Sequence, residues 1–507
     1  MSASCATPPA LAAPGTLLYD AAALRAIEAA ALADIDDPGA LMARAGQAAW
    51  RCALAHWPHA QRLLVICGPG NNGGDGYVLA RLAMESGRAV QVMRLAADAP
   101  RTPTAQAACA AFVAAGGEVT VFETDGLPQA DLVVDALYGI GLSRAAEGEA
   151  ARLIDAISAS DAPVFALDVP SGFDADRGSA PGPAVHANRT LQFLAAHVGL
   201  QTGDGSDHAG VLALDVLGVD TRHVAAATPA ARRVDVADLA HWLRPRARNS
   251  HKGASGRVLC VGGEHGFGGA VLLAAEAALR SGAGLVNVAT REAHIAPLLA
   301  RCPEAMASAV GTDAALAGLI GSADVVALGP GLGRGAWAHG LYADVLDAAP
   351  ALVLDADALN LLAGAPRALP EGTILTPHPG EAARLLDCTT AEVQRDRLSA
   401  VRALAARWSA VVVLKGAGTL VAAPGAMPWL VAAGNPGMAT GGMGDVLTGV
   451  IAALRAQGLA PEAAAVCGAL LHGAAGDIAA RAGGERGLRP TDLLPALRLL
   501  ANPEASR

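Results

Sequence analysis

Residues 435–445, Asn-Pro-Gly-Met-Ala-Thr-Gly-Gly-Met-Gly-Asp, end in a carboxylate that directly follows a glycine-rich run. An apolar helical pattern starts at the next residue, so the backbone amides of Gly442, Met443 and Gly444 form an anion hole at a helix start. Asp445 is placed to take the proton of a hydroxyl group that attacks a phosphoryl group. The alternative is that Asp445 only caps the helix. The glycines before it favour the catalytic interpretation.

Four further loops of the second half follow short apolar runs that predict strands. Lys415 begins the turn Lys-Gly-Ala-Gly-Thr, which suits a nucleotide phosphate, although a lysine after a strand is usually just solvated. His378 and Glu381 follow another strand and either bind substrate or initiate a helix. The other two loops are residues 329–333, Gly-Pro-Gly-Leu-Gly, and residues 355–360, Asp-Ala-Asp-Ala-Leu-Asn.

The first half carries its own glycine-rich run after a strand, residues 68–76, Gly-Pro-Gly-Asn-Asn-Gly-Gly-Asp-Gly. A strand, a glycine-rich turn and a helix start together make a site for an anion. The run is not a P-loop, because no Lys-Ser/Thr pair follows. A tight turn that merely needs glycine is the plain alternative. The two asparagines and the aspartate among the glycines favour a binding function.

Two more predicted strands of the first half end in aspartate, at Asp135 and at Asp168. Ligands of open parallel sheets bind outside the carboxyl ends of the strands, so these loops and the glycine-rich run point to one edge. Asp135 alone would also suit a helix cap or a surface position. Together with Asn72, Asp168 and Ser171 it offers oxygen ligands for a hard cation such as K⁺ or Mg²⁺.

The elements that position these residues alternate between helices and apolar strands. Residues 19–56 predict a helix, followed by strands at 63–67, 89–93, 119–122, 132–134 and 164–167 and by helices at 77–85, 103–115 and around Ile154. A second series has strands at 258–261, 285–289, 325–328, 352–354, 373–375 and 411–414 and helices at 269–280, 446–456 and 461–480. This alternation predicts an α/β fold with parallel sheets covered on both faces.

The length of 507 residues predicts more than one domain. The alanine-rich residues 224–231 and the arginine-bearing residues 232–248 mark a boundary. We therefore expect one domain at residues 1–225 and another at 226–507, each able to fold and act by itself.

Composition excludes several classes of protein. The chain is 53% hydrophobic and 17% charged, which is typical of a globular protein. Its net charge of −10 disfavours a general nucleic-acid or anionic-membrane surface. The longest uncharged stretch, residues 416–444, is broken by prolines and glycines, so we expect no membrane span. The eight cysteines of the chain show no C-x-x-C spacing, which indicates reduced thiols and a cytoplasmic protein.

Three runs of the first half resemble the NAD(P)H-hydrate epimerase family: residues 68–76, residues 135–142 (Asp-Ala-Leu-Tyr-Gly-Ile-Gly-Leu) and residues 167–172 (Leu-Asp-Val-Pro-Ser-Gly). The resemblance covers roughly residues 19–219 and implies a Rossmann-like fold with a bound K⁺. It implies that K⁺ is held by Asn72, Asp135 and Ser171. The substrate contacts that it implies are Asn71, Asn72, Gly73, Gly74, Asp75, Gly139, Ile140, Gly141, Leu142, Ser143, Arg144, Ala145 and Asp168.

We expect Asp168 to be the acid/base group of the epimerase, because reaction at the hydrated ring carbon requires proton transfer beside it. The alternative is that Asp168 only binds the ribose or the nicotinamide. Two residues depart from the family pattern. His197 stands before Val-Gly-Leu where a lysine is usual, and Ile140 replaces the commoner threonine, so details of substrate contact differ here.

The second half resembles the ADP/ATP-dependent NAD(P)H-hydrate dehydratases, with five motifs in order over roughly residues 234–500, beginning at Ser-His-Lys-Gly (250–253). The resemblance implies a ribokinase-like fold and phosphorylation of the hydrate by ADP in bacteria or ATP in eukaryotes, with Mg²⁺ on the nucleotide phosphates. The implied nucleotide contacts are Lys415, Gly416, Ala417, Gly418, Thr419 and Gly444. The implied hydrate contacts are Ala270, Gly333, His378 and Asp445.

Two rival interpretations remain open at this point. A plain ribokinase-like kinase would use the same anion hole but would leave a stable phosphate ester instead of NADH and free phosphate. Alternatively, the first half is a non-catalytic binding module. We expect small-molecule partners, namely the NADH and NADPH hydrates and ADP or ATP, together with a homo-oligomer and no nucleic-acid or membrane partner.

Overall fold

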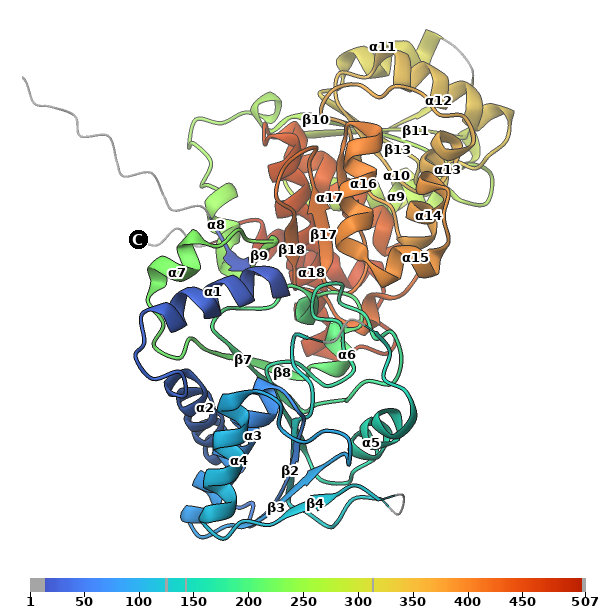
Figure 1. The fold of residues 1–507 in the computed structure, drawn as a ribbon. Coiled ribbons are helices and arrows are strands. Elements are labelled where there is room, and N and C mark those ends of the chain that lie inside the picture. Colours follow the sequence, from blue (N-terminus) through green and yellow to red (C-terminus); the bar gives the residue numbers. More distant parts are fainter. Residues whose placement is uncertain (1–13, 124–125, 142–143, 312–313, 504–507) are drawn as a thin grey trace, which may run out of the picture. The chain divides into compact units, whose positions relative to one another are not determined.

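The computed structural model describes residues 14–123, 126–141, 144–311 and 314–503 (Figure 1). The chain forms two compact units, which we describe separately. Of the described residues, unit 2 comprises 17–231 and 377–430, and unit 1 comprises 14–16, 232–376 and 431–503. Residues 377–430 thus group with the first half of the chain although they lie inside the predicted second domain.

Unit 2 contains a seven-stranded sheet in the order β4-β3-β2-β5-β6-β7-β8, and every neighbouring pair is parallel. Its strands are β2 (Arg62–Cys67), β3 (Ala89–Arg94), β4 (Val119–Val121), β5 (Leu132–Ala136), β6 (Val164–Leu167), β7 (Arg189–Phe193) and β8 (Val211–Asp215). The sequence prediction omits β7, whose apolar run is interrupted by Arg189 and Gln192, and also misses β8, although four of its five residues are apolar.

Helices cover both faces of this sheet, as predicted. Val65 packs into one core with Tyr77, whereas the next residue, Ile66, packs into the other core with Ile154. This alternation follows from the strand period of two. The helices are α1 (Ala21–Ala33), α2 (Ala40–His56), α3 (Asn71–Glu85), α4 (Pro103–Ala114), α5 (Gly148–Ser158), α6 (Gly205–His208) and α7 (Thr221–Ala226), with a 3-10 turn at Gly199–Gln201.

The single helix predicted at residues 19–56 is wrong, because the structure has two helices there, α1 and α2. Asp20 caps the first, accepting a hydrogen bond from the Ala23 amide at 2.8 Å. Pro38 and Gly39 lie between the two helices, where proline prevents a continuous helical backbone.

The glycine-rich run is another correction, because α3 begins at Asn71 and most of the run is therefore helical. Its glycines allow close packing. A β-carbon on Gly73 would lie 2.0 Å from the Gly68 carbonyl oxygen, and one on Gly76 would lie 2.7 Å from the Ala136 β-carbon. The sequence could not distinguish glycines needed for a turn from glycines needed for contact between a helix and a sheet.

Residues 377–430 of unit 2 form three helices and an antiparallel strand pair, β16 with β17. The elements are α14 (Pro379–Leu386), α15 (Thr390–Arg395), α16 (Arg397–Trp408), β16 (Val411–Leu414) and β17 (Thr419–Ala422). The sequence prediction contained β16 and, as one alternative, a helix initiated at His378 and Glu381, but not α15 or α16.

Unit 1 contains parallel strands in the order β15-β14-β13-β10-β11-β12. The strands are β10 (Arg257–Val261), β11 (Leu285–Thr290), β12 (Met306–Ala309), β13 (Val325–Leu328), β14 (Leu352–Leu354) and β15 (Ile374–Leu375). The chain passes from one unit to the other within three short strands, which are β1 (Thr16–Leu18), β9 (Ala231–Val234) and β18 (Trp429–Val431).

The helices of unit 1 include α9 (Gly268–Arg280) and α17 (Met443–Ala456), which pack tightly together. A β-carbon on Gly449 of α17 would lie 2.0 Å from the Ala274 carbonyl oxygen of α9, so this contact requires glycine. The others are α8 (Leu239–Trp242), α10 (Ile295–Arg301), α11 (Ala314–Ser322), α12 (Ala336–Ala348), α13 (Ala356–Gly364), α18 (Pro461–Gly483) and α19 (Leu494–Leu500).

Within the described ranges, α18 alone has the length and apolar composition that could cross a membrane. In the structure, 72% of its most apolar window is buried inside the protein, as in the core helix of a globular unit.

Candidate active sites

Asp168 follows β6 in a strained backbone conformation, with a φ of +64°. Positive φ is unfavourable for a residue with a β-carbon and is tolerated where the surroundings enforce it. The Asp168 amide donates to the Leu191 carbonyl at 2.8 Å, and the next amide, that of Val169, donates back to the Leu167 carbonyl at 2.8 Å. These bonds present the carboxylate outside the end of the strand.

Two groups hold the Asp168 carboxylate. The Ile140 amide donates to Oδ2 at 3.2 Å, and His197 Nε2 lies 3.3 Å from Oδ1. His197 is almost completely buried, and burial lowers the pKa of its imidazole although the Asp168 charge opposes the shift. Its Nδ1 has no hydrogen-bond partner, while its amide donates to Gln192 Oε1 at 2.7 Å. His197, which stands where a lysine is usual in the family, therefore contacts Asp168, the predicted acid/base group.

Further acidic side chains interact with Asp168. Burial, then the charges of Asp168 and Glu28, raise the pKa of Asp75 well above its usual value. Burial, then the Asp168 charge, also raises the pKa of Glu28, which is hydrogen-bonded to Asn71. Thr102 Oγ1 donates to Asn71 Oδ1 at 2.8 Å. Glu28 was not predicted as a site residue, because a glutamate in the middle of an alanine-rich helix is typical of a solvated surface.

Asp135 and Ser171, two of the three predicted K⁺ ligands, lie together. The Ser171 hydroxyl donates to Asp135 Oδ1 at 2.6 Å and the Ser171 amide to Oδ2 at 2.7 Å. Asp135 is fully buried, and burial raises the pKa of its carboxyl to about 6 although the bonds from Ser171 and Leu137 oppose the shift. The third predicted ligand, Asn72, has both amide atoms buried without a hydrogen-bond partner.

The Gly139 backbone lies close to both the Asn72 and the Asp168 side chains. A β-carbon there would lie 2.8 Å from Asp168 Oδ2 and 3.4 Å from the Asn72 β-carbon, so a larger residue would displace the Asp168 carboxylate. Gly141 and Ile140 line a cavity of about 400 Å³, and the Ile140 carbonyl accepts from Arg25 Nη2 at 3.2 Å. Of the remaining predicted contacts, Arg144 and Ala145 belong to the same loop, and Leu142 and Ser143 lie outside the described residues.

In unit 1, Asp445 is the third residue of α17, and Gly442 occupies the N-cap position with a φ of +96°. The alternative that Asp445 is the N-cap is therefore wrong. The amides of Met443, Gly444 and Asp445 belong to the first turn, where no carbonyl of the helix is available to them. This arrangement agrees with the predicted anion hole and places a carboxylate beside it.

Ala270 of unit 1 lies beside the loop that follows β13, which also contains Gly333. A β-carbon on Gly331 would lie 3.1 Å from the Ala270 β-carbon. The Gly333 amide donates to Asp357 Oδ2 at 2.9 Å. Asp357 comes from the fourth predicted loop, so two predicted loops meet.

In unit 2, His378 is the N-cap of α14, and Glu381 completes a capping box. The His378 amide donates to Glu381 Oε2 at 2.8 Å, which supports the alternative that these residues initiate a helix. Lys415 Nζ lies 3.8 Å from the same oxygen, and the Thr419 hydroxyl donates to the Gly416 carbonyl at 2.9 Å. Glu381 thus lies between His378 and the lysine of the glycine turn.

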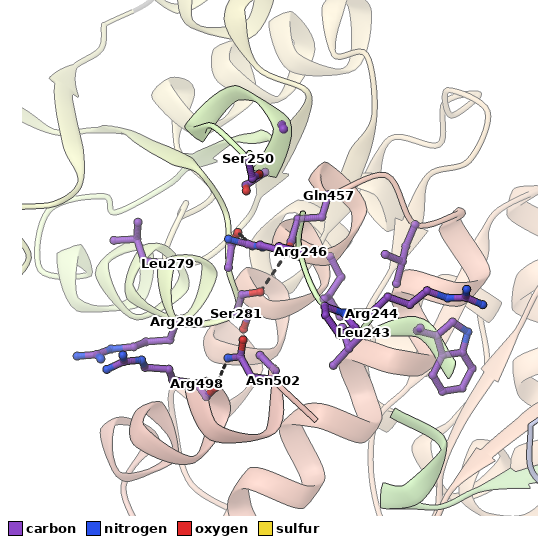
Figure 2. Close-up of a pocket in the computed structure, with 18 of the residues that line it drawn as sticks. Leu243, Arg244, Arg246, Ser250, Leu279, Arg280, Ser281, Gln457, Arg498 and Asn502 are labelled. Atoms are coloured by element: carbon purple, nitrogen blue, oxygen red, sulfur yellow. Dashed lines mark hydrogen bonds between the residues drawn. The ribbon is translucent and has the colours of Figure 1, made fainter. Parts of the chain in front are cut away.

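A cavity of about 1140 Å³ in unit 1 contains none of the predicted site residues (Figure 2). It lies at the C-terminal end of α17, whereas Asp445 lies at the N-terminal end. Figure 2 shows Arg246 beside Gln457, to whose Oε1 it donates at 2.7 Å; it also donates to the Gly282 carbonyl. Three arginines of the lining, Arg280, Arg301 and Arg498, lie in the last turns of α9, α10 and α19, where arginine offsets the helix dipole.

Comparisons with known proteins agree with the order of the two halves. Residues 38–199 match the family described as YjeF-related protein N-terminus, and residues 258–498 match NAD(P)H-hydrate dehydratase. The bifunctional NAD(P)H-hydrate repair enzyme Nnr of Escherichia coli (strain K12) is 45% identical over 466 residues, which cover 92% of this chain and 90% of the relative. The enzyme of the same name from Coxiella burnetii is 45% identical over 488 residues, which cover 96% of this chain and 100% of the relative.

Among solved structures, a ribokinase-like superfamily protein from Enterococcus faecalis matches with a TM-score of 0.51 and 32% identity, over 54% of this chain and 96% of that chain. The fold is thus α/β with parallel sheets and includes a ribokinase-like half, as predicted. The chain belongs to the family of bifunctional NAD(P)H-hydrate repair enzymes. The prediction of an enzyme with two activities is confirmed, against a plain kinase and against a non-catalytic first half.

Proposed function

We propose that Asp168 is the acid/base group of the epimerase and Asp445 that of the dehydratase in this NAD(P)H-hydrate repair enzyme. The assignment of Asp168 rests on one observation. Its backbone is strained, and its carboxylate contacts the Ile140 amide and His197. Inversion at the hydrated ring carbon requires its hydroxyl to leave as water and to return on the other face. A carboxyl that gives a proton and takes it back serves both steps.

The predicted substrate residues support a pocket around Asp168. Asn72, Gly139 and Ile140 are adjacent to its carboxylate, and Asn71 and Asp75 belong to the first turns of α3. Gly73 and Gly74 are packed against protein atoms. We therefore propose that they allow α3 to pack closely and do not contact the substrate directly. The other proposed contacts are Gly141, Leu142, Ser143, Arg144 and Ala145.

The proposal includes K⁺ in the epimerase half, held by Asn72, Asp135 and Ser171. The unpartnered, buried amide of Asn72 and the buried carboxylate of Asp135 fit a hard cation. One carboxylate among neutral oxygens provides little charge for a divalent ion, which favours K⁺. Bound there, the cation would offset the burial of the Asp135 charge and help to orient the substrate.

A K⁺ titration tests this part in full-length protein prepared with a bulky organic cation. Epimerisation and the melting temperature of the wild type should both rise with K⁺, and Asp135→Ala should lose both responses while it still dehydrates the reactive epimer. Full epimerisation without K⁺, or a response that survives in Asp135→Ala, would make Asp135 a structural residue.

In the dehydratase, the hydrate hydroxyl attacks the terminal phosphoryl group of ADP or ATP while Asp445 accepts its proton. The bond to the nucleotide breaks, and phosphate then leaves with the carbon–oxygen electron pair as the neighbouring ring carbon loses a proton. The amides at the start of α17, which include that of Gly444, would stabilise the negative charge of the phosphoryl group in this step. Mg²⁺ would accompany the nucleotide phosphates.

The remaining dehydratase assignments are contacts. Ala270, Gly333 and His378 would contact the hydrate, and the turn of Lys415, Gly416, Ala417, Gly418 and Thr419 would bind the nucleotide. We further propose the domain limits 1–225 and 226–507, a homo-oligomer and a cytoplasmic location. The two matched families leave residues 200–257 between them, which is consistent with a boundary near 225.

Incubation with each separated hydrate epimer, with and without ADP or ATP, tests the function. The epimers should interconvert without nucleotide, and only one should give NADH and free phosphate when nucleotide is added. Chromatography follows the products. A stable phosphate ester, or epimers that never interconvert, would contradict the proposal.

A further inference from the structure

The turn that begins at Lys415 is held by residues of the first half of the chain. Thr202 Oγ1 lies 2.8 Å from the Gly418 carbonyl oxygen and 3.3 Å from that of Ala417. The Gly203 amide donates to the same Ala417 carbonyl at 3.1 Å. A β-carbon on Gly418 would lie only 2.1 Å from the Gln201 carbonyl oxygen, so the two backbones meet with no room for a side chain.

The buried Arg397 side chain stabilises the contact between Thr202 and the turn. Its side chain is fully buried, and its Nε donates to Thr202 Oγ1 at 3.2 Å. Its Nη2 donates to the carbonyls of Leu414 and Lys415 at 3.3 and 3.2 Å, and its Nη1 donates to Gln394 Oε1 at 2.7 Å. A buried guanidinium requires such a full set of acceptors. Arg397 therefore joins Thr202 to the residues where the turn begins.

We propose that Thr202 and Arg397 are positioning residues of the dehydratase, which hold the turn of residues 415–419 in the shape that binds the nucleotide. This inference rests on the proposed nucleotide role of that turn. Thr202 lies five residues after His197, the neighbour of Asp168, so the epimerase half supplies part of the nucleotide site's support. Nucleotide affinity then depends on a residue outside the half that carries the phosphoryl chemistry.

Thr202→Val tests the proposal in the full-length protein, because it removes the hydroxyl and nearly conserves the volume. The dissociation constant of ADP or ATP, measured by equilibrium binding, should rise about tenfold, which corresponds to lost hydrogen bonds worth about 1.4 kcal/mol. The KM for nucleotide should rise in parallel, while kcat at saturating nucleotide and the KM for the hydrate change less than about twofold. Thr202→Ser, which keeps the hydroxyl, should restore wild-type binding.

Ser179→Ala is a matched control. The Ser179 hydroxyl donates to the Arg395 carbonyl at 2.9 Å, so it also joins the first half to residues 377–430, but its partner is not a residue of the turn. This variant should bind nucleotide like the wild type. Equal weakening by Ser179→Ala and Thr202→Val would mean general loosening and would overturn the inference.

Lys415→Ala separates this inference from the proposed function. If it leaves nucleotide binding unchanged, the turn does not bind nucleotide and its proposed role is wrong. If it weakens binding while Thr202→Val does not, the turn binds nucleotide but Thr202 does not position it. Thr202→Ala replaces the valine variant if that protein does not fold, with the same expected loss.

Discussion

The positive φ of Asp168 predicts that two substitutions with the same loss of activity differ in stability. Asp168→Ala and Asp168→Gly both remove the carboxylate and its contacts with the Ile140 amide and with His197. The two variants therefore lose the same interactions and differ only by the β-carbon. Glycine adopts a φ of +64° without strain, whereas alanine does not.

The expected difference in free energy of unfolding follows from that comparison. A left-handed conformation costs a residue with a β-carbon about 1–2 kcal/mol. Glycine loses about 0.5–1 kcal/mol more conformational entropy on folding. The net advantage of Asp168→Gly over Asp168→Ala is thus about 1 kcal/mol, or about 2 °C in the melting temperature of a unit of this size.

Calorimetry of both variants, with the epimerisation rate measured on the same preparations, tests this reasoning. Both should lose about 10²–10⁴ in epimerisation, the usual effect of removing an acid/base group. Dehydration of the reactive epimer should persist. Equal stability of the two variants would mean that the backbone at residue 168 is not left-handed in solution. Substantial epimerisation in either variant would limit Asp168 to substrate binding.

Three further predictions follow from the sites. Asp445→Asn should lower dehydratase turnover by about 10²–10⁴ while nucleotide binding and epimerisation persist; near wild-type turnover would exclude Asp445 as the base. Burial holds the pKa of His197 below 6.5, so the unfolded chain binds more protons below that pH, and the free energy of unfolding should fall as the pH drops from 6.5. His197→Gln should reduce this fall in pH titrations of stability, and an unchanged slope would mean that His197 is not its source. Cutting the chain near residue 228 should leave each half active, with a raised nucleotide KM in the second fragment because Thr202 is no longer attached; an unchanged KM would contradict that coupling.

The sequence alone was sufficient for elements and motifs whose signal is local. Strands β6, β13, β14 and β16 match their predicted residues, because each is a continuous apolar run between polar or glycine-rich loops. The motif residues Asp168 and Asp445 were identified in the same way. Each directly follows a recognisable strand or glycine run, so the position of the side chain in its element could be read from neighbouring residues.

Only the tertiary structure decided which residues support these groups. His197 meets Asp168 across residues that are distant in sequence, and no local pattern marks that contact. The start of α3 at Asn71 also had no local signal, because glycine permits both a turn and the close approach of a helix to a sheet. Thr202 contacts Gly418 across more than 200 residues, a hydrogen bond that exists only when the chain has folded. Local apolar periodicity determines the strands, whereas burial and long-range hydrogen bonds determine how the residues at their ends are held.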